Sequence, residues 1–221
     1  MPQEVQEFSK FPKLPKFNDV VTTPEQLHEI LGQPSKVAAE KAIPALDGHC
    51  RNFIERSPFL LIATADANGS MDVSPKGDPA GFVRILDNNT IAIPDRKGNR
   101  RADTFSNILE NPKVGLFFMV PGYRETLRVT GTAIIVRDLE LRQSMAIKGS
   151  TPELALVVNI EEVFFHCAKC VIRSGLWDSD NWNNIDDMSR LADALSDQTD
   201  SEETAQEMHE RIEESYEVNL Y

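Results

Sequence analysis

The sequence predicts a mainly β protein of the α+β class, an antiparallel barrel with flanking helices. Between residues 59 and 166 the chain carries short runs rich in β-branched and aromatic residues, separated by turn residues such as Asn68-Gly69 and Pro121-Gly122. One helical segment interrupts these runs. So many short strands with so few helices favour a barrel over a parallel αβ sheet.

The first 57 residues are expected to form an extended arm followed by short helices that pack on the barrel. Thr23 is a suitable cap for a helix, and Pro24 suits the first helical position because its missing N–H has no partner there in any case. Two more short helices are expected at 36–42 and 47–56.

The barrel is assigned to residues 58–184. Its strands are predicted at FLLIATA from Phe59, DVSP from Asp72, GFVRIL from Gly81, TIAIP from Thr90, VGLFFMV from Val114, TLRVTGTAIIV from Thr126 and ALVVNIEEVFF from Ala155. The interrupting helix is predicted at 99–110. Its apolar face would carry Ala102, Phe105, Ile108 and Leu109, which places that helix against the sheet.

Residues 185–221 form a strongly acidic segment with twelve Asp and Glu side chains against two arginines, within a chain of net charge −12. Helices are expected at about 186–196 and 202–215. Like charges and few apolar positions predict a helical tail that is peripheral to any ligand site. The rest of the chain is then almost charge-balanced.

Composition narrows the class of protein. No apolar run approaches the roughly 20 residues that cross a bilayer, and the N-terminus has no signal pattern, so we expect a cytoplasmic protein that binds no membrane. The overall acidity also argues against nucleic acid as a partner. Three cysteines are too few and odd in number for a disulfide framework, which favours reduced thiols.

The stretch IAIPDRKGNRRADTFSNILENP, residues 91–112, is typical of an anion site. A strand runs through Gly98 into a predicted helix that opens with two arginines. Asn99 is placed to cap that helix, and Arg100 and Arg101 supply guanidinium groups that bind phosphate oxygens in pairs. We therefore predict a site for a small phosphorylated ligand.

The charged residues and the possible metal ligands each allow another interpretation. The arginines of this stretch could merely pair with Asp95 and Asp103 on a solvated helix start. His166, Cys167 and Cys170 carry zinc-ligating groups, but a fourth ligand at suitable spacing is missing, so no metal site is predicted.

Four blocks in one order resemble a known family: SPKGDPAGFV, PDRKGNRRAD, VPGYRETLRVTGTA and FHCAKCVIRSGLW. They follow a strand that ends in a DxNG hairpin. The order of parts from about Phe59 to Val136 resembles the pyridoxamine 5′-phosphate oxidase-like FMN-binding split barrels, and the blocks are similar to a bacterial subgroup of flavoproteins in that superfamily.

The resemblance implies an antiparallel split barrel that binds FMN as a homodimer, with the cofactor at the subunit interface. Asn99, Arg100 and Arg101 would hold the phosphate, and backbone groups of residues 75–76 and 93–94 would line the flavin. Ser74 and Thr126 stand where the oxidases have an arginine and a glutamine, the glutamine reaching in from the other subunit. The cofactor-binding residues implied are Ser74, Pro75, Lys76, Ile93, Pro94, Asn99, Arg100, Arg101, Thr126 and Arg128, the last able to reach the phosphate across the dimer or to pair with Glu125.

The substrate does not follow from the resemblance, because the arginine- and histidine-bearing segment with which the oxidases bind pyridoxamine phosphate is missing. Lys169 and Arg173 are candidates for an anionic small-molecule substrate, with a surface salt bridge as the alternative. The expected function is an FMN-dependent oxidoreductase acting between a reduced nicotinamide and a small acceptor. A non-catalytic flavin-binding or sensing protein, or a barrel for a deazaflavin or haem-derived ligand, stays open. No catalytic residue is assigned, since a flavin carries the electron chemistry itself.

Overall fold

The computed structural model describes residues 17–221, which form two compact units, 17–40 and 41–221. The first unit contains helices α2 (Pro24–Leu31) and α3 (Lys36–Glu40). Thr23 Oγ1 accepts a hydrogen bond from the Gln26 N–H at 3.3 Å, so the predicted cap is confirmed. The predicted N-terminal arm lies mostly outside the described residues.

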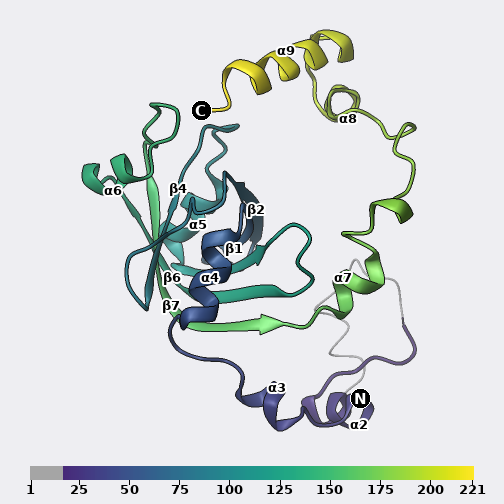
Figure 1. The fold of residues 1–221 in the computed structure, drawn as a ribbon. Coiled ribbons are helices and arrows are strands. Elements are labelled where there is room, and N and C mark those ends of the chain that lie inside the picture. Colours follow the sequence, from purple (N-terminus) through teal and green to yellow (C-terminus); the bar gives the residue numbers. More distant parts are fainter. Residues whose placement is uncertain (1–16) are drawn as a thin grey trace. The chain divides into compact units, whose positions relative to one another are not determined.

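An antiparallel sheet of seven strands forms most of the second unit (Figure 1). The strands are β1 (Phe59–Ala65), β2 (Met71–Gly77), β3 (Arg84–Ile85), β4 (Thr90–Pro94), β5 (Lys113–Met119), β6 (Thr126–Val136) and β7 (Ala155–His166). Their order is β2-β1-β5-β6-β7-β4-β3, so β2 and β3 are the edges and the sheet does not close. Of the predicted strands, GFVRIL is the least regular, because only Arg84 and Ile85 pair with β4.

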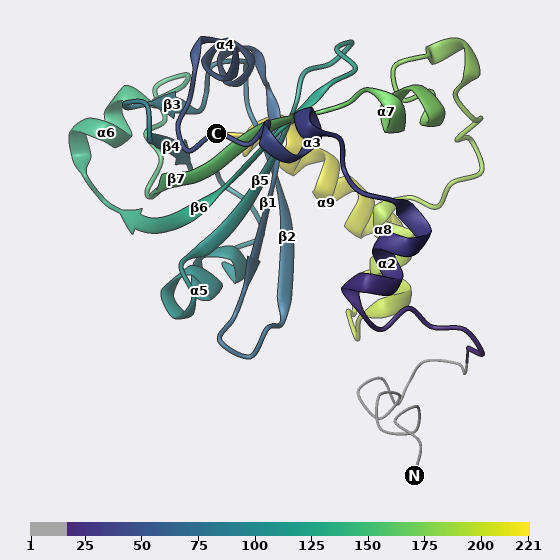
Figure 2. The ribbon, with the colours of Figure 1, turned by 90° about the horizontal axis from the view of Figure 1, so that it is seen from below.

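The core lies on the inner face of this sheet. Burial alternates along β1, where Leu60 and Ile62 are fully buried. Helix α4 (Gly48–Arg56) begins at Asp47, whose Oδ1 accepts from the Cys50 N–H at 2.8 Å. The helix adds Cys50, Phe53 and Ile54 to the same core. Helix α5 (Asp103–Glu110) packs against β1, β2 and β6 (Figure 2).

A β-bulge bends the long β6–β7 pair and lets the sheet curl. The register shifts between Thr130, which pairs with Glu162, and Gly131, which pairs with Ile160, so Glu161 is the extra residue. A Cβ at Gly131 would lie 2.0 Å from the carbonyl oxygen of Asn159, so only glycine fits this position. On the N-terminal side of the bulge, residues 155–159 of β7 pair with β4 as well as with β6.

A smaller layer covers the outer side of β4 and β7. Helix α6 (Leu139–Ser144) leads into Met145, which packs with Ala92 and Ala155 in a second cluster. Four of the five β4 residues are therefore buried, as expected for a strand covered on both faces.

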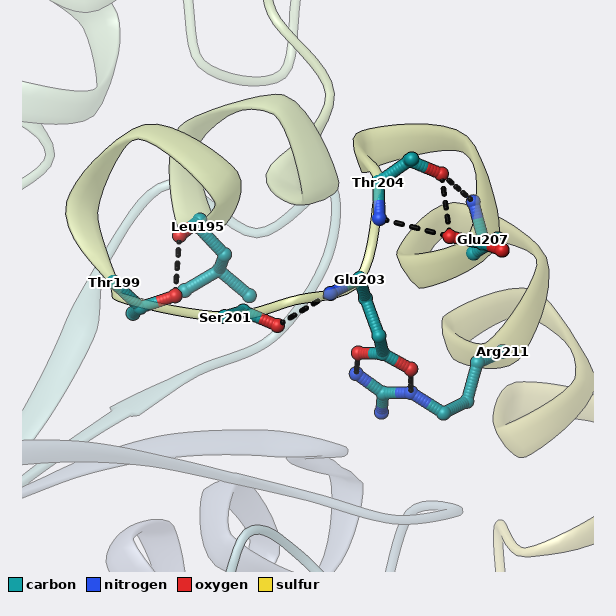
Figure 3. A network of polar contacts seen from close by, with 7 residues as sticks. All are labelled: Leu195, Thr199, Ser201, Glu203, Thr204, Glu207 and Arg211. Carbon is teal, nitrogen blue, oxygen red and sulfur yellow. Dashed lines mark hydrogen bonds and ion pairs between the residues drawn. The ribbon is translucent and has the colours of Figure 1, made fainter.

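The C-terminal region contains α7 (Lys169–Ser174), the 3₁₀ helix η2 (Ser179–Asn181), α8 (Leu191–Gln198) and α9 (Ala205–Val218). Both helices predicted for the acidic tail form, each beginning later than expected. Thr204 and Glu207 make a capping box at the start of α9, and Arg211 pairs with Glu203 at 2.8 Å (Figure 3). Helices α8 and α9 pack on each other and bury Ala192 and Met208.

Candidate functional site

Two ion pairs join the end of β2 to the end of β4 across the open side of the sheet. Arg96 Nε lies 2.6 Å from Asp78 Oδ2, and the Asp78 side chain is only 2% exposed. Lys76 Nζ lies 3.4 Å from Asp95 Oδ1, with both side chains partly exposed. Strands β2 and β4 themselves do not pair. We call this unpaired side of the sheet, bordered by Lys76 and Asp95, the split.

Ser74 lies on the same face of β2 as Lys76, in a network of hydroxyl groups around Asp72. Asp72 Oδ2 accepts from Ser74 Oγ at 2.9 Å and from Thr104 Oγ1 at 2.8 Å, and the two hydroxyl oxygens are 3.1 Å apart. Thr104 is buried in the first turn of α5. Asp72 and Thr104 therefore fix the start of α5 against β2, a contact that sequence reasoning missed.

The predicted helix start at Asn99 is wrong, because α5 begins at Asp103. Asn99 Oδ1 accepts from the Arg101 N–H at 3.0 Å, which closes a turn two residues on instead of capping a helix. Arg100 and Ala102 have φ angles of 62° and 60°, in the left-handed region. The arginines are thus presented by an exposed loop, residues 98–102, which precedes the helix and which we call the arginine loop.

The charged groups of this loop are partly paired with each other. Arg101 Nε donates to Asp103 Oδ2 at 2.7 Å, and this bond raises the pKa of Arg101. Asp95 pairs with Lys76 rather than with an arginine. The alternative in which the arginines merely pair with nearby carboxylates therefore holds for Arg101 and Asp103 alone. Arg100 forms no ion pair with any residue from 17 to 221.

On β4, Ile93 and Pro94 are buried, and Pro94 offers its backbone carbonyl to the split. Strand β3 pairs only with Ile91 and Ala92, so this edge of β4 is open from Ile93 onward. The Asp95 N–H donates to the Leu154 carbonyl on the β7 side at 3.0 Å. Because successive residues of a strand alternate in direction, the Pro94 carbonyl points away from β7, toward the open edge. Across the split, the Pro75 side chain is exposed on the opposite face of β2 from Lys76.

Thr126 and Arg128 lie on β6, between β5 and β7, and the chain does not bring them to the arginine loop. Thr126 is 2% exposed, and its Oγ1 has no hydrogen-bond partner in the described part of the chain. Arg128 is exposed and lies 5.2 Å from the Phe164 ring centroid. No ion pair between Arg128 and Glu125 forms in residues 17–221.

Lys169 and Arg173 are exposed on α7, and neither forms an ion pair within the described residues. His166, at the end of β7, lies near the rings of Phe117 and Phe164, with centroid distances of 6.2 and 4.9 Å. Burial lowers the pKa of His166, and the nearby cations Lys41 and Arg128 lower it further.

The acidic tail is less peripheral than expected, because Tyr221 contacts the border of the split. Its hydroxyl donates to Asp78 Oδ1 at 3.0 Å, and its backbone oxygen accepts from Lys97 Nζ at 2.8 Å. Lys97 directly precedes the glycine of the arginine loop. Nothing in the composition of the tail indicated this contact.

Other candidate chemistry is limited. Within residues 17–221, no three His, Cys, Asp or Glu side chains gather in a way that could hold a metal ion. Burial, followed by a hydrogen bond to Asp47, raises the pKa of the Cys50 thiol to about 12, so this cysteine is unreactive. In the same residues, no helix combines the length and the hydropathy needed to cross a bilayer.

Comparison with known proteins assigns the family. The family model of pyridoxamine 5′-phosphate oxidase matches residues 46–167, which is more than half of the chain and spans the sheet, α5 and the arginine loop. The chain belongs to this family, and its open antiparallel sheet with flanking helices is a split barrel of that type. A search of curated proteins found no match.

Solved structures of similar fold cover about half of this chain and most of their own. HupZ of Group A Streptococcus is 20% identical over 54% of this chain and 93% of its own, with a TM-score of 0.44. An FMN-binding protein of Syntrophomonas wolfei is 14% identical over 53% and 88%, with a TM-score of 0.40. General Stress Protein 26 of Bacillus anthracis is 13% identical over 52% and 88%, with a TM-score of 0.41. At these values the likenesses carry no argument about function.

Proposed function

We propose that this chain is an FMN-dependent oxidoreductase that passes hydride or electrons between a reduced nicotinamide and a small acceptor, and that it works as a homodimer with FMN at the subunit interface. The observation that carries the proposal is the split. In a member of this family, Ser74 and Lys76 border one side of it, the Pro94 carbonyl is directed toward it from the other, and the arginine loop follows β4 directly.

The loop residues fit a phosphate group. The Arg101–Asp103 pair lies at the surface, with side chains 72% and 42% exposed, so breaking it costs at most about 1 kcal/mol. A charge-assisted contact from arginine to phosphate contributes about 1.5–3 kcal/mol. Exchange of Asp103 for phosphate is therefore favourable. Arg100 is held in the left-handed region, at a cost of roughly 1–2 kcal/mol, and strain of this kind concentrates at binding sites.

Asp72, Asp95 and Asp103 are carboxylates that oppose an anion here, but Asp95 pairs with Lys76 and Asp103 with Arg101. Two hydroxyl donors already occupy the Oδ2 atom of Asp72, and these bonds hold Ser74 and Thr104 in place. Because its single O–H is donated to Asp72, Ser74 keeps only acceptor capacity for a ligand donor or a water. Arg100, which has no ion-pair partner within residues 17–221, offsets the charge of Asp72.

Bound FMN would supply the two-electron chemistry, while the residues of this chain bind and orient it. Asn99, Arg100 and Arg101 would hold the phosphate. The Pro94 carbonyl is free to meet the polar edge of the flavin ring, whereas the N–H and carbonyl of Ile93 point toward β7. Lys76 places an ammonium group beside the same opening. Lys169 and Arg173 stay proposed contacts for an anionic substrate.

The outer face of the sheet supports the homodimer. Met71 and Val73 on β2 are 67% and 58% exposed, and β1 places Ala63 beside them. A hollow of about 380 Å³ follows on this side, lined in part by Ala63, Gly115 and Thr130. An exposed apolar face with a hollow of this kind is removed from water when a second copy covers it.

The test is the absorption spectrum of the purified full chain, followed by its reduction with NADH or NADPH. We expect the spectrum of an oxidised flavin, bleaching on addition of one nicotinamide and return of the colour with an acceptor. Flavin that is bound but never reduced would identify a non-catalytic binding or sensing protein, and a different spectrum would identify a deazaflavin or haem-derived ligand. Light scattering should give about twice the 24.8 kDa chain mass, and a monomer that binds FMN tightly would contradict the dimer.

A further inference from the structure

Two cysteines lie three positions apart where β7 passes into α7. Cys167 directly follows the last residue of β7, and Cys170 is the second residue of α7. Both are exposed. Between them Ala168 has right-handed helical angles of −66° and −10°, and the Ile172 N–H donates to the Ala168 carbonyl at 2.9 Å. The chain therefore already turns in the helical sense from one cysteine to the other.

A turn of this kind brings two side chains near the separation that a disulfide needs. Residues three apart on a helical turn have Cβ atoms about 5–6 Å apart, whereas a disulfide needs about 3.5–4.5 Å. Closing the pair requires a movement of roughly 1–2 Å. The movement would fall on a helix of six residues, of which Val171 alone is buried, so little packing resists it.

We propose that Cys167 and Cys170 are a redox-active pair that forms a reversible disulfide by exchange with small disulfides such as oxidised glutathione. The thiolate of one cysteine attacks the small disulfide, forming a mixed disulfide and releasing one glutathione thiolate. The second cysteine then attacks the mixed disulfide and releases the other glutathione. Two electrons pass from the pair to glutathione disulfide, and the two cysteine protons end on the two glutathione thiols.

The surroundings favour an anionic disulfide of this class. Lys169 lies between the two cysteines and Arg173 lies one turn further along α7, and neither is paired with a carboxylate in the described part of the chain. Oxidised glutathione carries net negative charge, so these cations attract it. Cys50 is an internal reference, because burial makes it unreactive.

The test exposes the reduced full chain to a series of ratios of oxidised to reduced glutathione, then blocks free thiols with a maleimide and measures the intact mass. We expect a species that has lost two hydrogen atoms, takes up two fewer maleimides and returns to the reduced form with dithiothreitol. Trypsin cleaves after Lys169, between the cysteines. The disulfide will therefore appear as residues 149–169 linked to residues 170–173.

Two variants keep the result interpretable. Cys170→Ser removes the resolving thiol, so it should stop at a mixed disulfide with one glutathione, while Cys50→Ser should behave as the unchanged chain. The proposal is overturned if the chain stays fully reduced at high oxidised glutathione. It is equally overturned if it gains two glutathiones or forms only disulfides between chains. The outcome does not depend on whether FMN is bound.

Discussion

Replacing Arg100 and Arg101 together by alanine should separate cofactor binding from folding. In the free protein the change removes one surface ion pair, Arg101 with Asp103, so the free energy of unfolding should fall by no more than about 1 kcal/mol. In the complex it removes two charge-assisted phosphate contacts of about 1.5–3 kcal/mol each, less the cost of releasing Asp103. The Kd for FMN should therefore rise by about 10²–10⁴-fold.

The assay is titration of the apoprotein with FMN, followed by quenching of flavin fluorescence, with thermal unfolding measured in parallel. Arg211→Ala is the matched control, because Arg211 is also an exposed arginine paired with a carboxylate, Glu203, at 2.8 Å. A double variant that binds FMN within about threefold of the unchanged chain would refute the phosphate assignment. An equal loss in the control would show that the effect is one of net charge.

Three further predictions concern residues that stabilise the fold around the site. Gly131→Ala should lower the free energy of unfolding by about 3 kcal/mol or more in urea titration, because its Cβ meets backbone, whereas Gly48→Ala, in open space, should not lower it. Asp78→Ala removes a carboxylate that is only 2% exposed and leaves Arg96, which is 17% exposed, without its ion-pair partner, so a loss of about 3–5 kcal/mol in the same assay is expected; a loss below about 1 kcal/mol would contradict this. The folded pKa of His166 lies below its ordinary value of 6.5, so its contribution to stability is complete above about pH 6.5 and is lost as the pH falls through the folded pKa. In His166→Phe that part of the pH dependence of unfolding should flatten, and an unchanged slope would show that another group is responsible.

Local chemistry made much of the fold predictable. The caps at Thr23 and Asp47 satisfy helix N–H groups with side chains two or three residues away, so the residues that start these helices are neighbours in the sequence. The strands likewise follow from runs of β-branched residues bounded by turns, as at Thr126–Val136. Such signals do not depend on where the rest of the chain lies.

The details of the site were less predictable because they depend on competition and on distant partners. Asn99 can cap a helix or close a turn with its own loop, and the sequence does not say which hydrogen bond wins. Thr104 bonds to Asp72, 32 positions earlier, and Tyr221 bonds to Asp78, 143 positions earlier. No periodicity or spacing rule reports contacts of that range.

The split itself is encoded by two prolines on the edges that face each other. Pro75 lies within β2 and Pro94 ends β4, and a proline has no N–H to donate to a neighbouring strand. Strand β2 pairs with β1 and strand β4 pairs with β7, so the nitrogen atoms of the two prolines face the open edges. Direct pairing of β2 with β4 would need N–H donors at these positions. The buried Asp78–Arg96 pair then fixes the separation that the prolines keep open. The carbonyl groups on these open edges are not used by a neighbouring strand, so they can accept hydrogen bonds from a ligand. An open barrel therefore suits a cofactor that needs both an apolar surface and backbone hydrogen-bond partners, which a closed barrel does not offer.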